Sequence, residues 1–340
     1  MTKDPLVTLI QKLCQLDAST GKEKKSVDFL QDYLSKLGWK TERQPIGPEM
    51  GRDNLWAFSK DRNPKVIFST HLDTVPPFFP PHLSENGKTL LGRGVCDAKG
   101  IGACMVFAAE ELRKRKEQVG LLFVVGEETV SDGAKKAALY GVKAKYIVVG
   151  EPTEHHLIQA MKGIASFELK ATGISAHSAY PHLGTSALHQ LIEDIHTLLH
   201  FSWPKDPVLG ETTCNIGLIQ GGRAPNVIAD VASAKGTIRT VVKTEEILQS
   251  IRSCIHPTTQ LIPLNLSDPQ YLKIIDGIKT GIVSFGSDVP HLRPIGEPLL
   301  LGPGSILFAH TDNEKIDIED LHLAVDLYIQ VGLKLLNREC

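Results

Sequence analysis

The chain has 340 residues, of which 42% are hydrophobic and 22% charged, so it has the composition of a globular protein and the length for two cores. The net charge is −2 and the sequence contains no basic stripe, so nothing indicates a nucleic-acid partner. No run approaches the roughly 18 apolar residues of a membrane span, so nothing indicates a membrane partner either. The N-terminus lacks the apolar stretch and cleavage site of a signal peptide, and the six scattered cysteines contain no C-x-x-C pair, so we expect reduced thiols and a cytoplasmic location.

The first 160 residues alternate helix and strand patterns. Apolar residues at helical spacing predict helices over 1–17, 27–38, 100–116 and 132–141. Continuous apolar runs predict buried strands over 64–70, 119–126 and 144–150. This alternation favours an α/β fold with a mostly parallel sheet.

The pattern changes near Lys162 and returns to α/β character near Tyr271. Between these points, alternating polar and apolar residues predict antiparallel strands, and amphipathic segments predict helices over 184–201 and 245–255. A long amphipathic helix over 319–337 closes the chain. We therefore expect one domain from 1–161 and 272–340, interrupted by an inserted α+β domain of ferredoxin-like type over 162–271.

Acidic residues and histidines follow several of the predicted strands or precede a helix. His71 and Asp73 come directly after the apolar run 66–68, and positions two apart in a strand point to the same face. The other candidates are Asp97, Glu127, Glu128, Glu151 and His310. Each has an ordinary structural explanation when taken alone: a helix N-cap for Asp97, a solvated loop for the paired glutamates, a turn for Glu151 and a packed histidine at 310.

Taken together, these residues favour a shared site. Open α/β sheets bind ligands beyond the carboxyl ends of their strands, where most of these side chains are expected. Two histidines and several carboxylates without a cysteine form a nitrogen and oxygen ligand set, which suits zinc or a similar divalent ion. The set is large enough for two ions.

Seven motifs then occur in an order that resembles a known family. They are "THLDTVP", "GRGVCDAKG", "GEET", "GEPT", "AHSAYP", "NVIADVASAKGTIR" and "AHTDNEKI". The chain resembles the di-zinc M20 amidohydrolases and peptidases, and within them the branch of acetylornithine deacetylase, succinyl-diaminopimelate desuccinylase and aminoacylase. The glutamate of "GEPT" favours this branch over the tripeptidases.

The resemblance implies roles for the candidate residues. His71, Asp97 and Glu151 would hold one zinc ion, and Asp97, Glu128 and His310 the other, with cobalt or manganese as substitutes. Asp73 would hydrogen-bond His71 and fix its tautomer. Glu127 would be the general base.

The resemblance also implies a homodimer, formed through an inserted dimerisation and lid domain. His177 would reach the partner's active site and stabilise the oxyanion; the alternative is a loop histidine on the dimer surface. Asn226 and Arg239 would contact the oxyanion or the substrate carboxylate. Gly302, Gly304 and Ser305 would contribute donors near that carboxylate.

The implied activity is hydrolysis of the amide bond of a small N-acylated amino acid, with N-acetylornithine deacetylation in arginine biosynthesis as the first expectation. The alternatives are a succinyl-diaminopimelate desuccinylase, a broader aminoacylase, and an M20 dipeptidase or carboxypeptidase. A non-catalytic, metal-stabilised dimeric binding protein is a more distant alternative, because such a protein would be expected to lack a ligand or the base.

Overall fold

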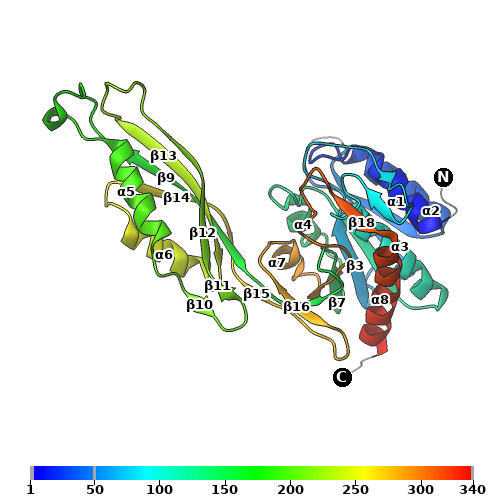
Figure 1. Cartoon of the computed structure of the whole chain (residues 1–340). Helices are drawn as coiled ribbons and strands as arrows, with labels where there is room; N and C mark the ends of the chain where they lie inside the picture. The colour runs from blue at the N-terminus through cyan, green and yellow to red at the C-terminus, as the bar shows by residue number, and fades with distance from the viewer. Residues whose placement is uncertain (1–3, 49–50, 338–340) are drawn as a thin grey trace. The chain divides into compact units, whose positions relative to one another are not determined.

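The structure is a computed structural model that describes residues 4–48 and 51–337. The chain divides into two compact units (Figure 1). The first unit comprises Met1–Gln159, Leu272–Gly281 and Ser287–Cys340, and the inserted unit comprises Ala160–Tyr271 and Ile282–Gly286. The inserted unit thus begins two residues before the expected boundary. It also contains a second short segment, 282–286, that the sequence pattern did not indicate.

A six-stranded sheet forms the centre of the first unit, in the order β1-β2-β6-β3-β7-β17. Its strands are β1 (Lys40–Pro45), β2 (Asp53–Phe58), β3 (Val66–His71), β6 (Val119–Val124), β7 (Tyr146–Val149) and β17 (Glu297–Leu300). The neighbours β6, β3, β7 and β17 run parallel, whereas β1 and β2 are antiparallel to each other and β2 to β6. Every residue of β3, β6 and β7 is buried, as expected for apolar strands covered on both faces. The sheet is therefore mixed but mostly parallel, in agreement with the predicted α/β class.

Helices cover this sheet on both sides (Figure 1). They are α1 (Pro5–Cys14), α2 (Lys24–Lys36), α3 (Lys99–Lys114), α4 (Asp132–Ala137), α7 (Val289–Leu292) and α8 (Ile318–Asn337). Helices α3 and α8 pack against each other and against β3, where Phe68 meets Tyr328 edge-on at 5.8 Å between ring centroids. Helices α4 and α7 pack together on the other side.

Short strands form two further small sheets, one in the first unit and one at the chain segments that connect the two units. Strands β4 (His82–Leu83), β5 (Thr89–Leu91) and β18 (Lys315–Asp317) form a small sheet in the order β18-β5-β4. Strands β8 (Leu157–Met161), β15 (Gln270–Tyr271) and β16 (Thr280–Val283) pair where the chain passes between the units.

Among the described residues, no helix has both the length and the apolar character needed to cross a membrane.

The inserted unit is a four-stranded sheet with two helices. Its elements are β9 (Gly163–Thr172), α5 (Ala187–Leu199), β12 (Thr213–Gly221), β13 (Val231–Thr240), α6 (Thr244–Cys254) and β14 (Gln260–Ser267). A 3₁₀ turn (Pro181–Leu183) and the two-residue strands β10 (Lys205–Asp206) and β11 (Gly210–Glu211) lie in its loops. The antiparallel order β12-β13-β9-β14 gives the ferredoxin-like arrangement that was predicted. Its separate core includes Phe167 of β9, Leu191 of α5 and Ile251 of α6.

Candidate metal centre

Three neighbouring parallel strands bring candidate ligands to one edge of the first unit's sheet. His71 is the last residue of β3 and pairs with Val124, the last residue of β6. Glu127 and Glu128 follow β6 after two residues, and Glu151 follows β7 after one. Because β6, β3 and β7 are adjacent and parallel, their carboxyl ends meet, as the sequence predicted.

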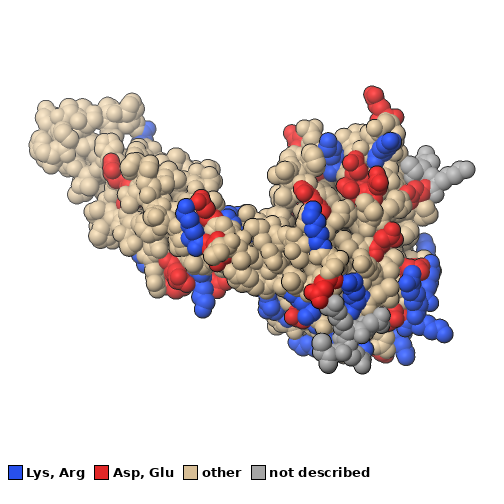
Figure 2. Space-filling view, turned by 60° about the horizontal axis from the view of Figure 1, so that its bottom comes forward, with Lys and Arg blue, Asp and Glu red and all other residues tan. Residues whose placement is uncertain are grey.

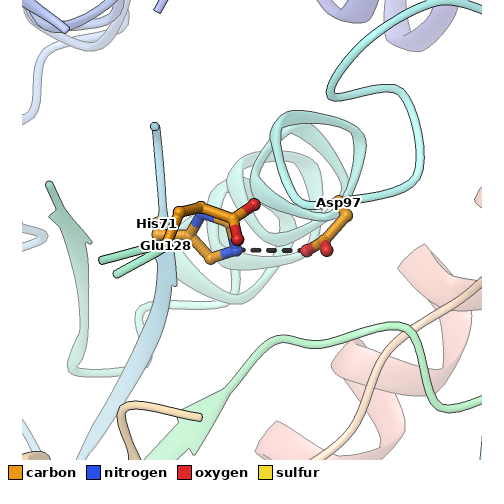
Figure 3. Close-up of side chains that lie close together, drawn as sticks. All are labelled: His71, Asp97 and Glu128. Atoms are coloured by element: carbon orange, nitrogen blue, oxygen red, sulfur yellow. Dashed lines mark hydrogen bonds and ion pairs between the residues drawn. The ribbon is translucent and has the colours of Figure 1, made fainter. Parts of the chain in front are cut away.

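Asp97 lies between two histidines. Its Oδ1 lies 3.1 Å from Nε2 of His71, and its Oδ2 lies 3.3 Å from Nε2 of His310. His310 also lies 2.9 Å from Oε2 of Glu128. Single ligand atoms of His71, Asp97 and Glu128 lie within 4.8 Å of one another (Figure 3). A carboxylate that presents one oxygen to each histidine has the arrangement of a ligand shared by two cations.

The alternative structural role of Asp97 is not observed. Helix α3 has Ala98 at its N-cap and no capping bond from a side chain. His310 adopts a positive φ of 63°, which is uncommon for a residue with a side chain and often marks a functional position. The packing explanation for His310 also fails, because about half of its side chain is exposed.

Asp73 acts differently from the expectation. His71 Nδ1 bonds to the backbone carbonyl of Asp73 at 2.9 Å, whereas the Asp73 carboxylate is 3.7 Å away. A carbonyl only accepts, so Nδ1 carries the proton and Nε2 is left for a cation. The carboxylate of Asp73 instead accepts the backbone N–H groups of Glu127 at 3.1 Å and Glu128 at 3.2 Å. It therefore orients the two glutamates, and only its main chain orients His71.

An Asp73→Asn variant is expected to keep its metal but turn over more slowly. The carbonyl bond to His71 survives, whereas one N–H of the glutamate loop then faces an amide NH₂. We expect metal affinity to fall by about 10- to 100-fold and kcat to fall with it. Metal content after dialysis and kcat at saturating metal measure both effects. Complete loss of metal would instead indicate that Asp73 is itself a ligand.

The electrostatics of the site indicate an excess of buried negative charge. Burial is the largest cause that raises the pKa values of Glu127 and Glu151 well above normal, and neighbouring carboxylates raise them further. Burial also raises the pKa of Asp97, but hydrogen bonds from His310 and His71 outweigh it and hold that pKa below its usual range. Several buried carboxylates beside two histidines are costly without a cation. The nitrogen and oxygen donors fit divalent ions of the zinc type.

Comparison with known proteins decides the family. Residues 67–334 match the model of peptidase family M20/M25/M40. The chain belongs to this family. A peptidase M20 domain-containing protein of Schizosaccharomyces pombe is 35% identical, with 96% of this chain and 83% of the relative covered. A probable carboxypeptidase of Aspergillus terreus is 33% identical, with 96% and 86% covered.

Solved structures of M20 proteins share the fold. A tripeptidase from Staphylococcus aureus superposes with a TM-score of 0.82 at 20% identity, over 98% of both chains. An M20 metallo-carboxypeptidase from Sulfolobus solfataricus gives 0.78 at 15% identity, over 98% and 99%. A dinuclear metal-binding M20 peptidase from Bacillus subtilis gives 0.70 at 17% identity, over 97% of both. The chain therefore has the M20 peptidase fold and belongs to a hydrolase family; the acetylornithine deacetylase branch receives no support from these names.

Metal binding by this M20 protein is expected to strengthen with pH. In the metal-free protein, hydrogen bonds to Asp97 and Glu128 raise the pKa of His310 to about 10. At pH 8 the imidazole holds a proton that a metal must displace, so binding should release at least the proton of His310. Calorimetric zinc titrations between about pH 6 and pH 9, in buffers of different protonation enthalpy, measure affinity and proton release. An affinity independent of pH would contradict this assignment.

In the segment "GPGS", two of the expected donors are engaged within the chain. The N–H of Gly302 donates to Thr153 Oγ1 at 2.9 Å, and the hydroxyl of Ser305 donates to Glu154 at 2.5 Å. Gly304 accepts the N–H of Glu154. A Cβ at 302 would collide with the carbonyl oxygen of Glu151, so glycine is needed there for close packing. In this structure the segment supports the loop that carries Glu151.

The remaining predicted residues lie in the inserted unit, in two separate places. His177 and Asn226 are exposed on adjoining loops, where Ser178 N–H donates to the Asn226 carbonyl at 3.0 Å. Arg239 lies on β13 opposite Ile164, near the start of β9, whereas the His177 loop follows the end of β9. Arg239 is partly buried, and its Nη1 has no hydrogen-bond partner.

One acidic residue near the centre was not predicted. Asp288 is 2% exposed, and its Oδ1 has no hydrogen-bond partner. Burial raises its pKa to about 7, and its charge in turn raises the pKa values of Glu127 and Glu151. In the sequence it is a single aspartate before Val289 and Pro290, which reads as an ordinary turn.

Proposed function

We propose that this protein is a metal-dependent hydrolase that cleaves the amide bond next to a free α-carboxylate, as a carboxypeptidase does. The observation that supports this most directly is Asp97, which offers one oxygen to each of two histidines. The carboxypeptidase name of relatives such as the Aspergillus terreus protein favours this broader activity over N-acetylornithine deacetylation.

We assign two divalent ions, with zinc as the first choice, to one set of ligands: His71, Asp97, Glu128, Glu151 and His310. When bound, such ions lower the pKa of a water molecule and polarise a carbonyl group. The dinuclear M20 relative of known structure supports the number of ions. The absence of cysteine from the set supports zinc, cobalt or manganese over softer ions.

Glu127 is the proposed general base. Its raised pKa suits a group that takes a proton from the attacking water and later gives it up. The water oxygen bonds to the carbonyl carbon, the carbon–nitrogen bond breaks, and the proton passes through Glu127 to the leaving amine. Asp73 keeps Glu127 and Glu128 in separate roles, because each of its oxygens accepts one of their backbone N–H groups.

Arg239 is the proposed receptor for the substrate carboxylate. It is a partly buried cation whose Nη1 has no hydrogen-bond partner, and burial lowers its pKa. A carboxylate is the natural partner for such a group, because the planar guanidinium can bind it through two parallel bonds. Asn226 and His177 are proposed to stabilise the oxyanion.

We propose a homodimer, which the distance between these residues within one inserted unit supports. The length of β9 separates Arg239 from His177 by roughly 25 Å, too far for both to serve one substrate from one chain. Ile192 and Leu199 of α5 and Leu218 and Ile219 of edge strand β12 are exposed, which suits a protein interface. The visible surface of this unit also carries fewer charged side chains than the first unit (Figure 2). We propose that His177 acts in the partner's site.

The five described cysteines are all free thiols, which supports a reducing compartment such as the cytoplasm. Cys340 lies outside the described residues.

A substrate panel tests the activity. The protein is stripped with a chelator, reloaded with zinc, cobalt or manganese, and offered dipeptides, tripeptides, N-acetyl and N-succinyl amino acids, N-acetylornithine, and the C-terminal amides of the same peptides. We expect cleavage of compounds with a free carboxylate and none of the amides. Cleavage of N-acetylornithine alone would restore the narrower deacetylase function. No cleavage with any metal would overturn the enzyme proposal and favour a metal-stabilised binding protein.

A further inference from the structure

Glu314 is a buried carboxylate, 1% exposed, four residues after His310. Its Oε1 accepts three backbone N–H groups, from Gly94 at 2.9 Å, Cys96 at 3.1 Å and Asp97 at 3.1 Å. Its own carbonyl accepts a fourth, from Gly92, at 3.1 Å. One residue therefore anchors most of the segment that leads into Asp97.

Arg93 compensates the buried charge of Glu314. It is 1% exposed, and its Nη1 donates to Oε2 of Glu314 at 2.8 Å. Its guanidinium also lies over the ring of Phe79 at 4.8 Å, and its Nε donates to the Pro77 carbonyl at 3.3 Å. The pair is thus held on both sides, which keeps Oε1 of Glu314 directed at the backbone of the Asp97 segment.

This anchor connects the two segments that supply facing ligands. Asp97 presents one oxygen to His71 on β3 and the other to His310. His310 lies on the same short segment as Glu314, and Asp97 donates its N–H to Glu314. Two contacts therefore set the distance between His310 and Asp97. One is the contact between their side chains, and the other is the hydrogen bond from the Asp97 N–H to the Glu314 carboxylate, which joins the two segments.

We propose that Glu314 is a positioning residue that sets how Asp97 is shared between two metal ions. The proposal rests on the metal centre of the proposed function. Glu314 touches neither substrate nor metal in this role; it acts through Asp97. A residue that only stabilises the loop would change the unfolding temperature but leave the geometry around the ions unchanged in the folded protein.

The test is Glu314→Gln in the full chain, with cobalt as the probe. The amide oxygen can still accept the three N–H groups, though more weakly, while its NH₂ opposes Arg93. We expect cobalt and zinc affinity to fall by about 10- to 100-fold and the visible cobalt spectrum to change. At saturating metal, kcat should fall while KM for the best substrate stays within about twofold.

A double variant covers the case in which an unpaired Arg93 prevents folding. Arg93→Met with Glu314→Gln removes the buried cation and keeps the amide oxygen. Asp194→Asn is the matched control, because Asp194 is also a buried carboxylate, which accepts the His256 N–H at 2.7 Å and the Thr259 hydroxyl at 2.6 Å within the inserted unit. The control should lower the unfolding temperature without changing metal affinity.

Wild-type metal affinity and cobalt spectrum in a folded Glu314 variant would overturn the proposal, whatever its unfolding temperature. The metal titrations need no substrate. A wild-type protein that binds two ions and cleaves nothing therefore contradicts the proposed activity and leaves the role of Glu314 to be decided by the spectra.

Discussion

Replacement of Glu127 by glutamine is expected to lower kcat by roughly 10²- to 10⁴-fold, the usual contribution of a general base. Glutamine has nearly the same shape and cannot take a proton from water. The backbone N–H of residue 127 can still donate to Asp73, so the loop should keep its conformation. Because Glu127 is not among the proposed ligands, metal content should remain at the wild-type value.

Single-turnover kinetics, together with metal analysis, measure this effect. Glu85→Gln is a suitable control, because Glu85 is exposed and belongs to the same unit. Loss of metal in Glu127→Gln would make this residue a ligand. Activity within a few-fold of wild type would assign the base elsewhere, with the buried Asp288 as the next candidate.

Asp97→Asn is expected to abolish activity through loss of metal. Asparagine keeps one oxygen and replaces the other with an NH₂ group, which cannot bind a cation. It therefore cannot present an oxygen to both His71 and His310 as Asp97 does. We expect metal affinity to fall by more than about 100-fold, beyond the effect of changing a group that only orients a ligand.

Metal analysis after gel filtration should show at most one tightly bound ion per chain. Asp312→Asn, an exposed change two residues from His310, should keep both ions and full turnover. Two ions with normal activity in Asp97→Asn would contradict a shared carboxylate and would reduce the centre to independent sites.

The sequence predicted the fold best at the strands that are buried on both faces, because burial there restricts which residues the strands can contain. Strands β6 and β7 lack charged residues and β3 begins with the apolar run 66–68, so the histidine and carboxylates that follow these runs were conspicuous, and parallel pairing placed them together. The edge strand β1, "KTERQP", was not predicted, because a polar edge strand has little apolar pattern and depends on its neighbour for its conformation.

Finer details of the site depend on contacts between distant segments. Sequence spacing placed Asp73 beside His71 but could not show that a carbonyl makes the bond while the carboxylate holds Glu127 and Glu128. Likewise, Glu314 is 217 residues from Asp97 along the chain. A single glutamate in "DNEKI" carries no local pattern that reveals such a partner.

The interrupted course of the chain has a consequence for biosynthesis. When the ribosome has translated the first 271 residues, the inserted unit has all its helices and long strands, with its own core. The first unit at that moment lacks β17, α8 and His310, which are all encoded later. Domains generally fold as units during synthesis, so the core of the inserted unit can form before its segment 282–286 and the rest of the first unit are made. His310 is translated after the core of the inserted unit, so the candidate metal centre can be completed only after that core has been made.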